Sequence, residues 1–365
     1  SMLTLTALAL AYALASSRPR APQPLTYALA SARPRAPPPL ALAGRGFGPQ
    51  AAPVPSLPTT LDADAQALLD ESGGDATKAR TSMMGYTLAY VAEEMPELYA
   101  ALKEDPKRPD AHAALVEITW DAIAAFLPVT HAPTPTKAAG QKLTAVARCG
   151  VGVLDGSDPP SVLDVGCGTG LLLPFLTTLG APPQRYRGID LSPRMVEVAQ
   201  RVHALPAYEG ATFEDVSFDS LASEAEPLLY DAIFFNAALQ FFPDPSAALA
   251  GAARLLAPGD ESRIVLSHIS GASFVQKELE DNPTTVRSLM PTLEELEAIA
   301  APLGLQVVLP SFLGADAESI ATALDAFYCV VLRWDAAHGG VDGETGSTEA
   351  PADQAPPNLS GGLTG

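Results

Sequence analysis

Between residues 162 and 333, short apolar runs rich in β-branched and aromatic residues alternate with helical patterns. The strand-like runs are VLDV (162–165), YRGID (186–190), ATFE (211–214), YDAIFFN (230–236), RIVLSH (263–268), LQVVL (305–309) and AFYCVVLR (326–333). Strands that alternate with helices form parallel pairs, and strands that are apolar on both sides are covered on both faces. The alternation therefore predicts an α/β fold with a doubly wound, mostly parallel seven-stranded sheet and helices on both faces.

A helical region precedes the sheet. Residues 81–150 show three or four helical patterns, punctuated by prolines, and no strand pattern. We therefore expect a helical N-terminal extension over residues 62–150, packed on the carboxyl edge or the side of a sheet domain over residues 151–335.

The two ends of the chain have compositions unlike that of a folded domain. Leu3–Ser16 is an apolar run as long as the h-region of a signal peptide, and Arg, Ser, Ala and Pro dominate the acid-free sequence that follows. Ala11–Leu25 is repeated by Thr26–Leu40 with identity at 12 of 15 positions. We interpret residues 1–61 as a disordered targeting leader. The alternative interpretation is a disordered, Pro-rich tail that carries no targeting signal. Residues 336–365 are rich in Gly, Pro and acidic residues, and we expect a disordered tail there.

The leader resembles the bipartite presequences of proteins sent to plastids that are bounded by extra membranes. It therefore predicts a plastid location, with the mitochondrion as the alternative.

Charge and apolar run length limit the classes of partner. Residues 62–365 hold 17 basic and 42 acidic residues, a net charge of −25, which would repel a phosphate backbone. No run of 18 apolar residues follows position 20, so we expect no integral membrane segment in the mature chain. The three cysteines form no Cys-x-x-Cys pair, and we expect neither a disulfide framework nor a metal site.

The first strand runs directly into a glycine-rich turn. Asp164-Val165-Gly166-Cys167-Gly168-Thr169-Gly170 brings backbone close to a ligand at the carboxyl end of this strand. Asp190 ends the second strand 24 residues after Gly166, and a carboxylate there can accept hydrogen bonds from both hydroxyls of a ribose. The turn is neither G-x-G-x-x-G nor a P-loop, which disfavours NAD and ATP.

These segments resemble the class I S-adenosylmethionine-dependent methyltransferases. The resemblance is carried by VLDVGCGTG (162–170), GIDLS (188–192), YDAIFFNAALQFFPDP (230–245) and AARLLAPGD (252–260), and it covers about residues 160–335. It implies a Rossmann-like sheet, S-adenosylmethionine as cofactor, and methyl transfer to a small-molecule acceptor by in-line displacement. Asp260 stands where the family has a second Gly, and Gln240 stands where many small-molecule members have a His.

The resemblance also implies roles for particular residues. Asp164, Gly166, Gly168 and Gly170 would hold the methionine end of the cofactor, with Cys167 as a small residue beneath it. Asp190 would bind the ribose and Leu191 would pack on the adenine. After the third strand the register leaves two pairs of alternatives, Asp215 or Asp219 for the polar contact and Val216 or Phe218 for the backbone contact.

The substrate end of the site follows from two further strand ends. Asn236 closes the fourth strand, where cofactor and acceptor would meet. A general base is needed only for an acceptor that is protonated at working pH, and His268, at the end of the fifth strand, is our candidate. The long connection 270–290 is either a substrate lid or a surface insertion.

Two functions remain open on the sequence alone. The first is a methyltransferase that acts on a small molecule, with an apolar or quinone-like acceptor favoured by the apolar segment 237–242. The second is a catalytically inactive methyltransferase-like domain that binds a protein partner, which the departures at Asp260 and Gln240 keep open.

Overall fold

A computed structural model describes residues 59–74, 76–125, 135–152, 159–314 and 316–335. Residues 1–58 of the predicted leader (1–61) and the predicted tail after residue 335 lie outside these ranges, whereas residues 59–61, for which we expected disorder, begin a helix. Within them, no helix has the length and apolar character needed to cross a bilayer.

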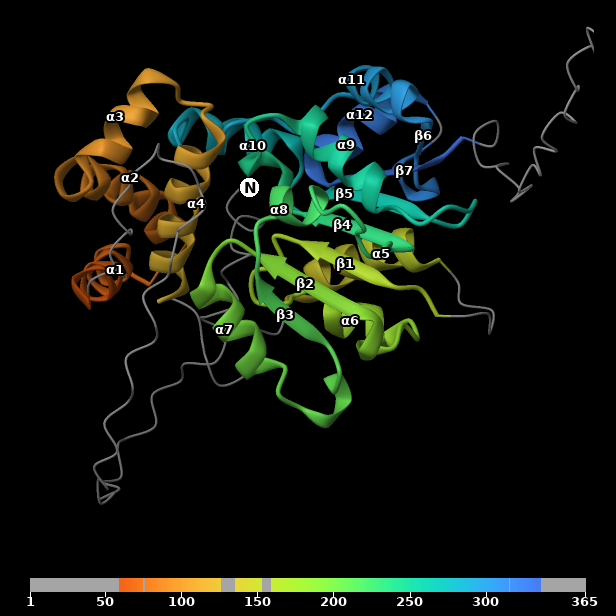
Figure 1. Ribbon diagram of the computed structural model, residues 1–365, viewed down its shortest axis with the longest axis horizontal. Helices are drawn as coiled ribbons and strands as arrows, with labels where there is room; N and C mark the ends of the chain where they lie inside the picture. The colour runs from red at the N-terminus through yellow and green to blue at the C-terminus, as the bar shows by residue number, and fades with distance from the viewer. Residues whose placement is uncertain (1–58, 75, 126–134, 153–158, 315, 336–365) are drawn as a thin grey trace, which may run out of the picture.

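Seven strands form one sheet, as the sequence predicts (Figure 1). The strands are β1 (Val162–Val165), β2 (Tyr186–Asp190), β3 (Thr212–Asp215), β4 (Ala232–Asn236), β5 (Arg263–His268), β6 (Leu305–Val308) and β7 (Tyr328–Trp334). Their order is β3-β2-β1-β4-β5-β7-β6, and β7 is antiparallel to both of its neighbours while the other pairs are parallel. The order reverses between β1 and β4, and this is where open parallel sheets bind ligands.

In the described residues, helices lie before and between the strands. Those of the extension are α1 (Thr59–Glu71), α2 (Ala76–Glu94), α3 (Pro96–Glu104) and α4 (Pro109–Ala124). Those associated with the sheet are α5 (Lys137–Val151), α6 (Leu173–Thr178), α7 (Pro193–Val202), α8 (Phe218–Ala222), α9 (Pro245–Leu255), α10 (Ala272–Asp281), α11 (Leu293–Ala300) and α12 (Ala317–Ala326). A 3₁₀ turn, η5 (Leu239–Phe241), follows β4.

Successive residues of the central strands face two separate cores. Phe234 packs with α5, α6 and α7, and Phe235 packs with α8, α9 and α11. A Cβ built on Gly150 of α5 would lie 2.1 Å from the Phe234 ring, so α5 sits directly on β4. This double coverage explains why the strands are apolar at nearly every position.

The helical extension has a core of its own and a second core shared with the sheet domain. Helices α2, α3 and α4 bury one apolar cluster among themselves. Met83 of α2 and Ile123 of α4 form another cluster with Met195 of α7. Asp121 of α4 accepts hydrogen bonds from the Ser192 hydroxyl and the Arg194 amide at the start of α7. Figure 1 shows the extension beside α7, at the carboxyl ends of β1 and β2.

The connection 270–290 holds a helix that the strand–helix pattern did not predict. Helix α10 packs against α12, and the segment after it lies against α4 and η5. There the Thr285 carbonyl meets the His112 ring, and the Arg287 and Ser288 amides donate to the Gln240 carbonyl. The connection therefore packs against α4 and η5, and its interpretation as a substrate lid or as a surface insertion stays a prediction.

Candidate functional site

The glycine-rich turn after β1 has a left-handed backbone at each of its three glycines. Gly166, Gly168 and Gly170 have φ angles of 65°, 53° and 73°. A Cβ on Gly166 would lie 2.7 Å from the Ala238 Cβ, and one on Gly170 would lie 2.6 Å from the Phe213 ring, whereas one on Gly168 would meet nothing within 4 Å. The first and third glycines are thus required by packing, and the second leaves a space beside the backbone.

Asp190 ties this turn to the end of β2. Its Oδ2 accepts a hydrogen bond from the Gly168 amide at 2.8 Å, and its Oδ1 accepts one from the Ser192 amide at 2.9 Å. Burial outweighs these bonds and raises the pKa of Asp190 to about 6. Each carboxylate oxygen keeps acceptor capacity beyond its one backbone donor, so the group can bind ligand hydroxyls without losing its place.

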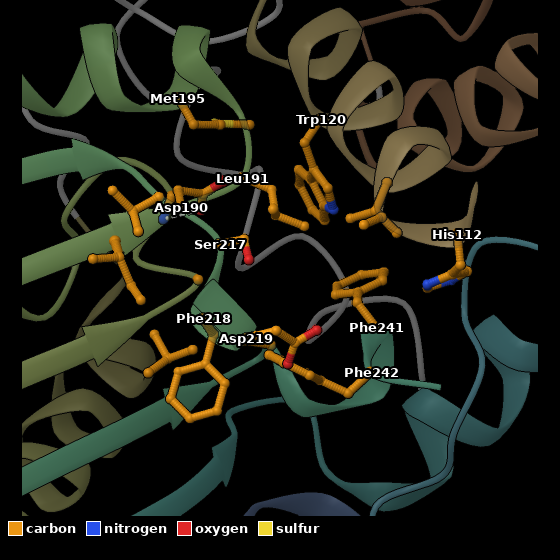
Figure 2. Close-up of a pocket in the computed structure, with 18 of the residues that line it drawn as sticks. His112, Trp120, Asp190, Leu191, Met195, Ser217, Phe218, Asp219, Phe241 and Phe242 are labelled. Atoms are coloured by element: carbon orange, nitrogen blue, oxygen red, sulfur yellow. Dashed lines mark hydrogen bonds between the residues drawn. The ribbon is translucent and has the colours of Figure 1, made fainter. Parts of the chain in front are cut away.

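The turn and Asp190 border one cavity at the carboxyl edge of the sheet. It contains about 920 Å³ of space, part of it open to solvent. Its walls come from β1, β2, η5, α8 and α4, and Figure 2 shows Asp190 on one side and His112 on the other. The lining residues are Pro109, His112, Ala113, Val116, Trp120, Val165, Gly166, Gly168, Ile189, Asp190, Leu191, Met195, Val216, Ser217, Phe218, Asp219, Ala237, Ala238, Phe241, Phe242 and Pro243.

The centre of the cavity is aromatic. Trp120 and Phe241 meet edge to face with ring centroids 5.4 Å apart, and Leu191 lies beside them (Figure 2). Phe242 packs in the same manner on Phe218, at 5.8 Å. These rings give flat apolar walls on either side of the space between Asp190 and His112.

The charges on the wall suit a cationic ligand. Asp190 and Asp219 are its carboxylates, and none of the described lining residues is Lys or Arg. Partial burial raises the pKa of Asp219 above its usual range. Carboxylates and ring faces both attract positive charge, and the cavity holds them together.

Three of the glycine-turn residues that we predicted lie behind the wall rather than on it. Asp164 is buried, accepts a hydrogen bond from the Tyr186 hydroxyl at 2.8 Å, and has its pKa raised to about 7 by burial. The Cys167 thiol is buried against Gly188, and burial raises the pKa of this thiol well above its usual range. Gly170 is enclosed by Phe213 and His203. All three residues therefore support the conformation of the turn and do not line the cavity.

The segment after β3 contains the two pairs of residues that the sequence left as alternatives for contacts with the cofactor. Val216, Ser217, Phe218 and Asp219 line the cavity. Asp215 is the last residue of β3, is exposed, and is not on the wall. Of the two carboxylates considered, Asp219 is therefore the one within reach of a ligand, while Val216 and Phe218 both remain available.

Asn236 and His268 do not line this cavity. Asn236 Oδ1 accepts a hydrogen bond from the Ser267 hydroxyl at 3.0 Å. His268 is buried, its ring stacks on Phe274, and its Nδ1 accepts the Ser270 amide at 3.3 Å. Burial, together with the charges of Arg80 and Lys142, lowers the pKa of His268 to about 3. Its ring lone pair is already used by backbone, so a catalytic role for His268 stays a prediction that this geometry does not favour.

The acceptor side of the cavity includes residues that sequence reasoning missed. Helix α4 contributes Val116, His112 and Trp120, and the Trp120 ring both packs on Phe241 and lines the cavity. No motif marks these positions, because α4 is apolar around most of its circumference. Ala237, also on the wall, is the only non-glycine with a positive φ among the described residues, at 56°.

The two departures from the family pattern lie away from the lining. Asp260 is exposed in the turn before β5. The Gln240 side chain is buried with its Oε1 unpartnered among the described residues, and its carbonyl holds the 282–288 segment. Neither one changes the wall of the cavity.

The wall fits a nucleoside that carries a cationic sulfur. The empty space beside Gly168 allows a ligand to approach backbone, Asp190 retains acceptors for ribose hydroxyls, and Leu191 with Phe218 offers apolar faces for a base. No group of three His, Cys, Asp or Glu side chains within the described ranges is arranged to hold a metal ion.

Comparisons with known proteins agree with this geometry. A family model described as a methyltransferase domain matches residues 157–308. The ubiquinone biosynthesis O-methyltransferase of Leptothrix cholodnii is 31% identical over 185 residues, which cover 48% of this chain and 72% of that protein. The ubiquinone biosynthesis O-methyltransferase of Xanthomonas campestris is 37% identical over 150 residues, 41% of this chain and 56% of that protein.

For several of the curated relatives the chain spans about half of the relative's length, from 44% to 62%. Among solved structures, the magnesium protoporphyrin IX methyltransferase of Synechocystis with bound S-adenosylmethionine is 18% identical, with a TM-score of 0.42, over 61% of this chain and 97% of that one.

The matched segment carries the glycine turn, Asp190 and the wall from Val216 to Pro243, and the Leptothrix relative is aligned over more than two thirds of its length. The chain belongs to the class I S-adenosylmethionine-dependent methyltransferases.

Proposed function

We propose that this chain transfers the methyl group of S-adenosylmethionine to a small, flat, apolar acceptor that carries a hydroxyl group. One observation carries the proposal: a single cavity joins the glycine turn and Asp190 to an aromatic wall formed by α4 and η5. Both relatives are named O-methyltransferases, which supports oxygen as the acceptor atom.

The cofactor end of the cavity is formed by the turn and by the ends of β2 and β3. The space beside Gly168 lets the cofactor approach the protein backbone. Asp190 accepts hydrogen bonds from the ribose hydroxyls, and Asp219 faces the base or its amino group. When bound, S-adenosylmethionine supplies an electrophilic methyl group on a positively charged sulfur. Asp190 and Asp219 favour that charge, and the lack of Lys and Arg among the described lining residues spares it repulsion.

The acceptor end supplies orientation and excludes water. A flat acceptor ring packs against Trp120, Phe241 and Phe242, and these contacts fix the direction from which its nucleophile approaches the methyl group. The same rings keep water from the reacting atoms.

Calorimetry and a transfer assay test the proposal. S-adenosylmethionine should bind the full chain with measurable heat, and Asp190→Ala should weaken binding by at least about tenfold, because a ribose hydrogen bond to a carboxylate contributes about 1.5–3 kcal/mol. Incubation with a metabolite pool and methyl-labelled cofactor should label a small molecule. No heat on adding S-adenosylmethionine would instead favour a catalytically inactive domain that acts through a protein partner.

We also propose that residues 1–61 direct the protein to a plastid, with the mitochondrion as the alternative. The support is compositional: an apolar run followed by a duplicated, Arg-rich and acid-free segment. A fluorescent protein fused to residues 2–60 should accumulate in the organelle, and fluorescence in the cytosol would refute the proposal.

A further inference from the structure

We propose that His112, on helix α4 of the N-terminal extension, is the general base that takes the proton of the acceptor hydroxyl. This inference rests on the proposed function and adds a catalytic residue to it. His112 lies outside residues 157–308, the part of the chain that the family model matches, so its role is not transferred from the family.

His112 lies where it can reach the acceptor. His112 lines the cavity on the side opposite Asp190, with the Trp120 and Phe241 rings between them (Figure 2). An acceptor held by those rings lies between the cofactor end and the His112 imidazole. A general base must be within hydrogen-bond reach of the proton it removes, and His112 is the imidazole on this wall.

The His112 ring has a defined tautomer. His112 Nε2 lies 2.9 Å from the Thr285 carbonyl oxygen, which only accepts hydrogen bonds, so Nε2 carries the proton. A neutral imidazole then has its lone pair on Nδ1. His268 shows the reverse arrangement, since its Nδ1 lone pair is occupied by the Ser270 amide. Of these two buried histidines, His112 is the one whose basic nitrogen accepts no hydrogen bond from the residues that the structure describes.

The resting His112 ring is uncharged. Burial, with a smaller contribution from the Arg287 guanidinium, lowers the pKa of His112 to about 4. The ring is therefore neutral above about pH 5, and Nδ1 carries no proton there. Because a ring with this pKa is a weak base, it takes the proton only as the acceptor oxygen bonds to the methyl carbon, which makes the hydroxyl strongly acidic, and it then releases the proton to solvent.

The transfer conserves charge within the cavity. A lone pair of the acceptor oxygen forms the new O–C bond to the methyl carbon, and the S–C bond breaks with its electron pair remaining on sulfur. The O–H bond breaks with its pair remaining on oxygen, and the proton moves to His112 Nδ1. The single positive charge leaves sulfur and reappears on the imidazole, so the apolar walls enclose one cation before and after the step.

The experiment compares two probe acceptors in the full chain. Catechol is protonated at pH 7.5, whereas 4-nitrocatechol is already ionised there and needs no base. His112→Gln keeps a side-chain N–H for the Thr285 carbonyl but has no basic nitrogen. We expect its kcat to fall about 100-fold with catechol and to change by less than about threefold with 4-nitrocatechol. The Kd for S-adenosylmethionine should stay within about twofold of wild type, because the cofactor end is untouched.

The variants separate a base from a structural residue. His112→Ala removes both the base and the Thr285 bond, so it should lose activity with both acceptors. Equal losses with both acceptors in His112→Gln, or no loss with either, would overturn the proposal. So would a loss confined to catechol in His268→Gln but not in His112→Gln.

A readout without turnover keeps the proposal separate from the proposed function. Histidine ¹⁵N spectra of the full chain should show His112 with its proton on Nε2 at pH 7 and no protonation above about pH 5, as its burial predicts. A proton on Nδ1, or a charged ring at pH 7, would overturn it. Failure of the wild-type chain to bind S-adenosylmethionine would overturn the proposed function while leaving this spectrum to be judged on its own.

Discussion

At the scale of single residues, the glycines of the turn separate binding from packing. Gly168→Ala places a methyl group in the open space where we expect the cofactor, and Gly170→Ala places one in the Phe213 ring. We expect Gly168→Ala to raise the Kd for S-adenosylmethionine more than about tenfold while destabilising the fold by about 1–2 kcal/mol, the cost of a left-handed alanine. Gly170→Ala should lower the free energy of unfolding by about 2–4 kcal/mol, because overpacking adds to that cost. Calorimetry and urea unfolding measure the two effects, and a reversed ranking would contradict the assignment of Gly168 to the ligand.

Asp164 predicts a pH dependence of stability. Its pKa in the folded chain is raised to about 7, above the ordinary value for Asp, so the folded state holds a proton that the unfolded state has released. Its contribution to stability is full below about pH 4 and is lost as pH rises to about 7. Asp164→Asn keeps an acceptor for the Tyr186 hydroxyl and removes the titration.

The stability of Asp164→Asn relative to wild type should therefore increase by about 2 kcal/mol between pH 5 and pH 8. Urea unfolding of both proteins at the two pH values measures this difference. The exposed Glu318→Gln serves as the control and should follow the wild-type profile. A constant difference between Asp164→Asn and wild type would show that Asp164 is ionised in the folded chain.

The residue scale also shows what the sequence could predict. Gly166, Gly168, Asp190 and Leu191 were identified because the turn and the carboxylate follow two strands whose apolar character is plain, and parallel strands end at one edge. His112 was not identified, because its position depends on how a separate helical layer packs over that edge. His268 was chosen for its place at a strand end, but the alternation of side chains along β5 turns its ring toward Phe274.

At the scale of elements, strands were easier to predict than helices. The buried strands are nearly continuous apolar runs, so each expected strand exists with ends shifted by at most about two residues. Helix α10 was missed because its sequence is polar on most sides, and it buries Val275 and Glu278. The sequence does not show that a Glu in a polar helix is buried, because its burial depends on a partner residue on another element.

That partner is Arg80 of α2, which forms a buried ion pair with Glu278 and joins the extension to α10. Arg80 Nε and Glu278 Oε2 have no hydrogen-bond partner within the described part of the chain, so the pair is incompletely compensated. Glu278→Leu should destabilise the protein by about 3–5 kcal/mol, because it leaves a buried guanidinium unpaired. Arg80→Met combined with Glu278→Leu should recover most of that loss, since both charges are then removed. Urea unfolding of the single and double variants tests this, and additive losses would contradict an energetic coupling between the two helices.

At the scale of the whole molecule, the cavity lies between the sheet domain and the helical extension, which are formed by different segments of the chain. The sheet domain supplies the turn, Asp190 and Phe241, and the extension supplies Val116, Trp120 and His112. The Asp121 bonds to Ser192 and Arg194 connect the two layers, and Ser192 in turn donates to Asp190. A ligand in the cavity therefore contacts both layers, and its binding energy stabilises their association as well as each layer.

This coupling predicts how the protein responds to S-adenosylhomocysteine, which has the nucleoside but no methyl group to transfer. At 100 times its Kd the ligand should add about 2.7 kcal/mol to the free energy of unfolding, by mass action. Amide hydrogen exchange should slow in the glycine turn and also in α4. The exchange rates of the amides of β6, at the far edge of the sheet, should not change where exchange occurs by local opening and not by global unfolding. Asp190→Ala with a tenfold higher Kd should reduce the added free energy of unfolding to about 1.4 kcal/mol at the same ligand concentration. Protection confined to residues 164–192 would mean that the extension does not take part in binding, and the acceptor wall on α4 would then have to be reassigned.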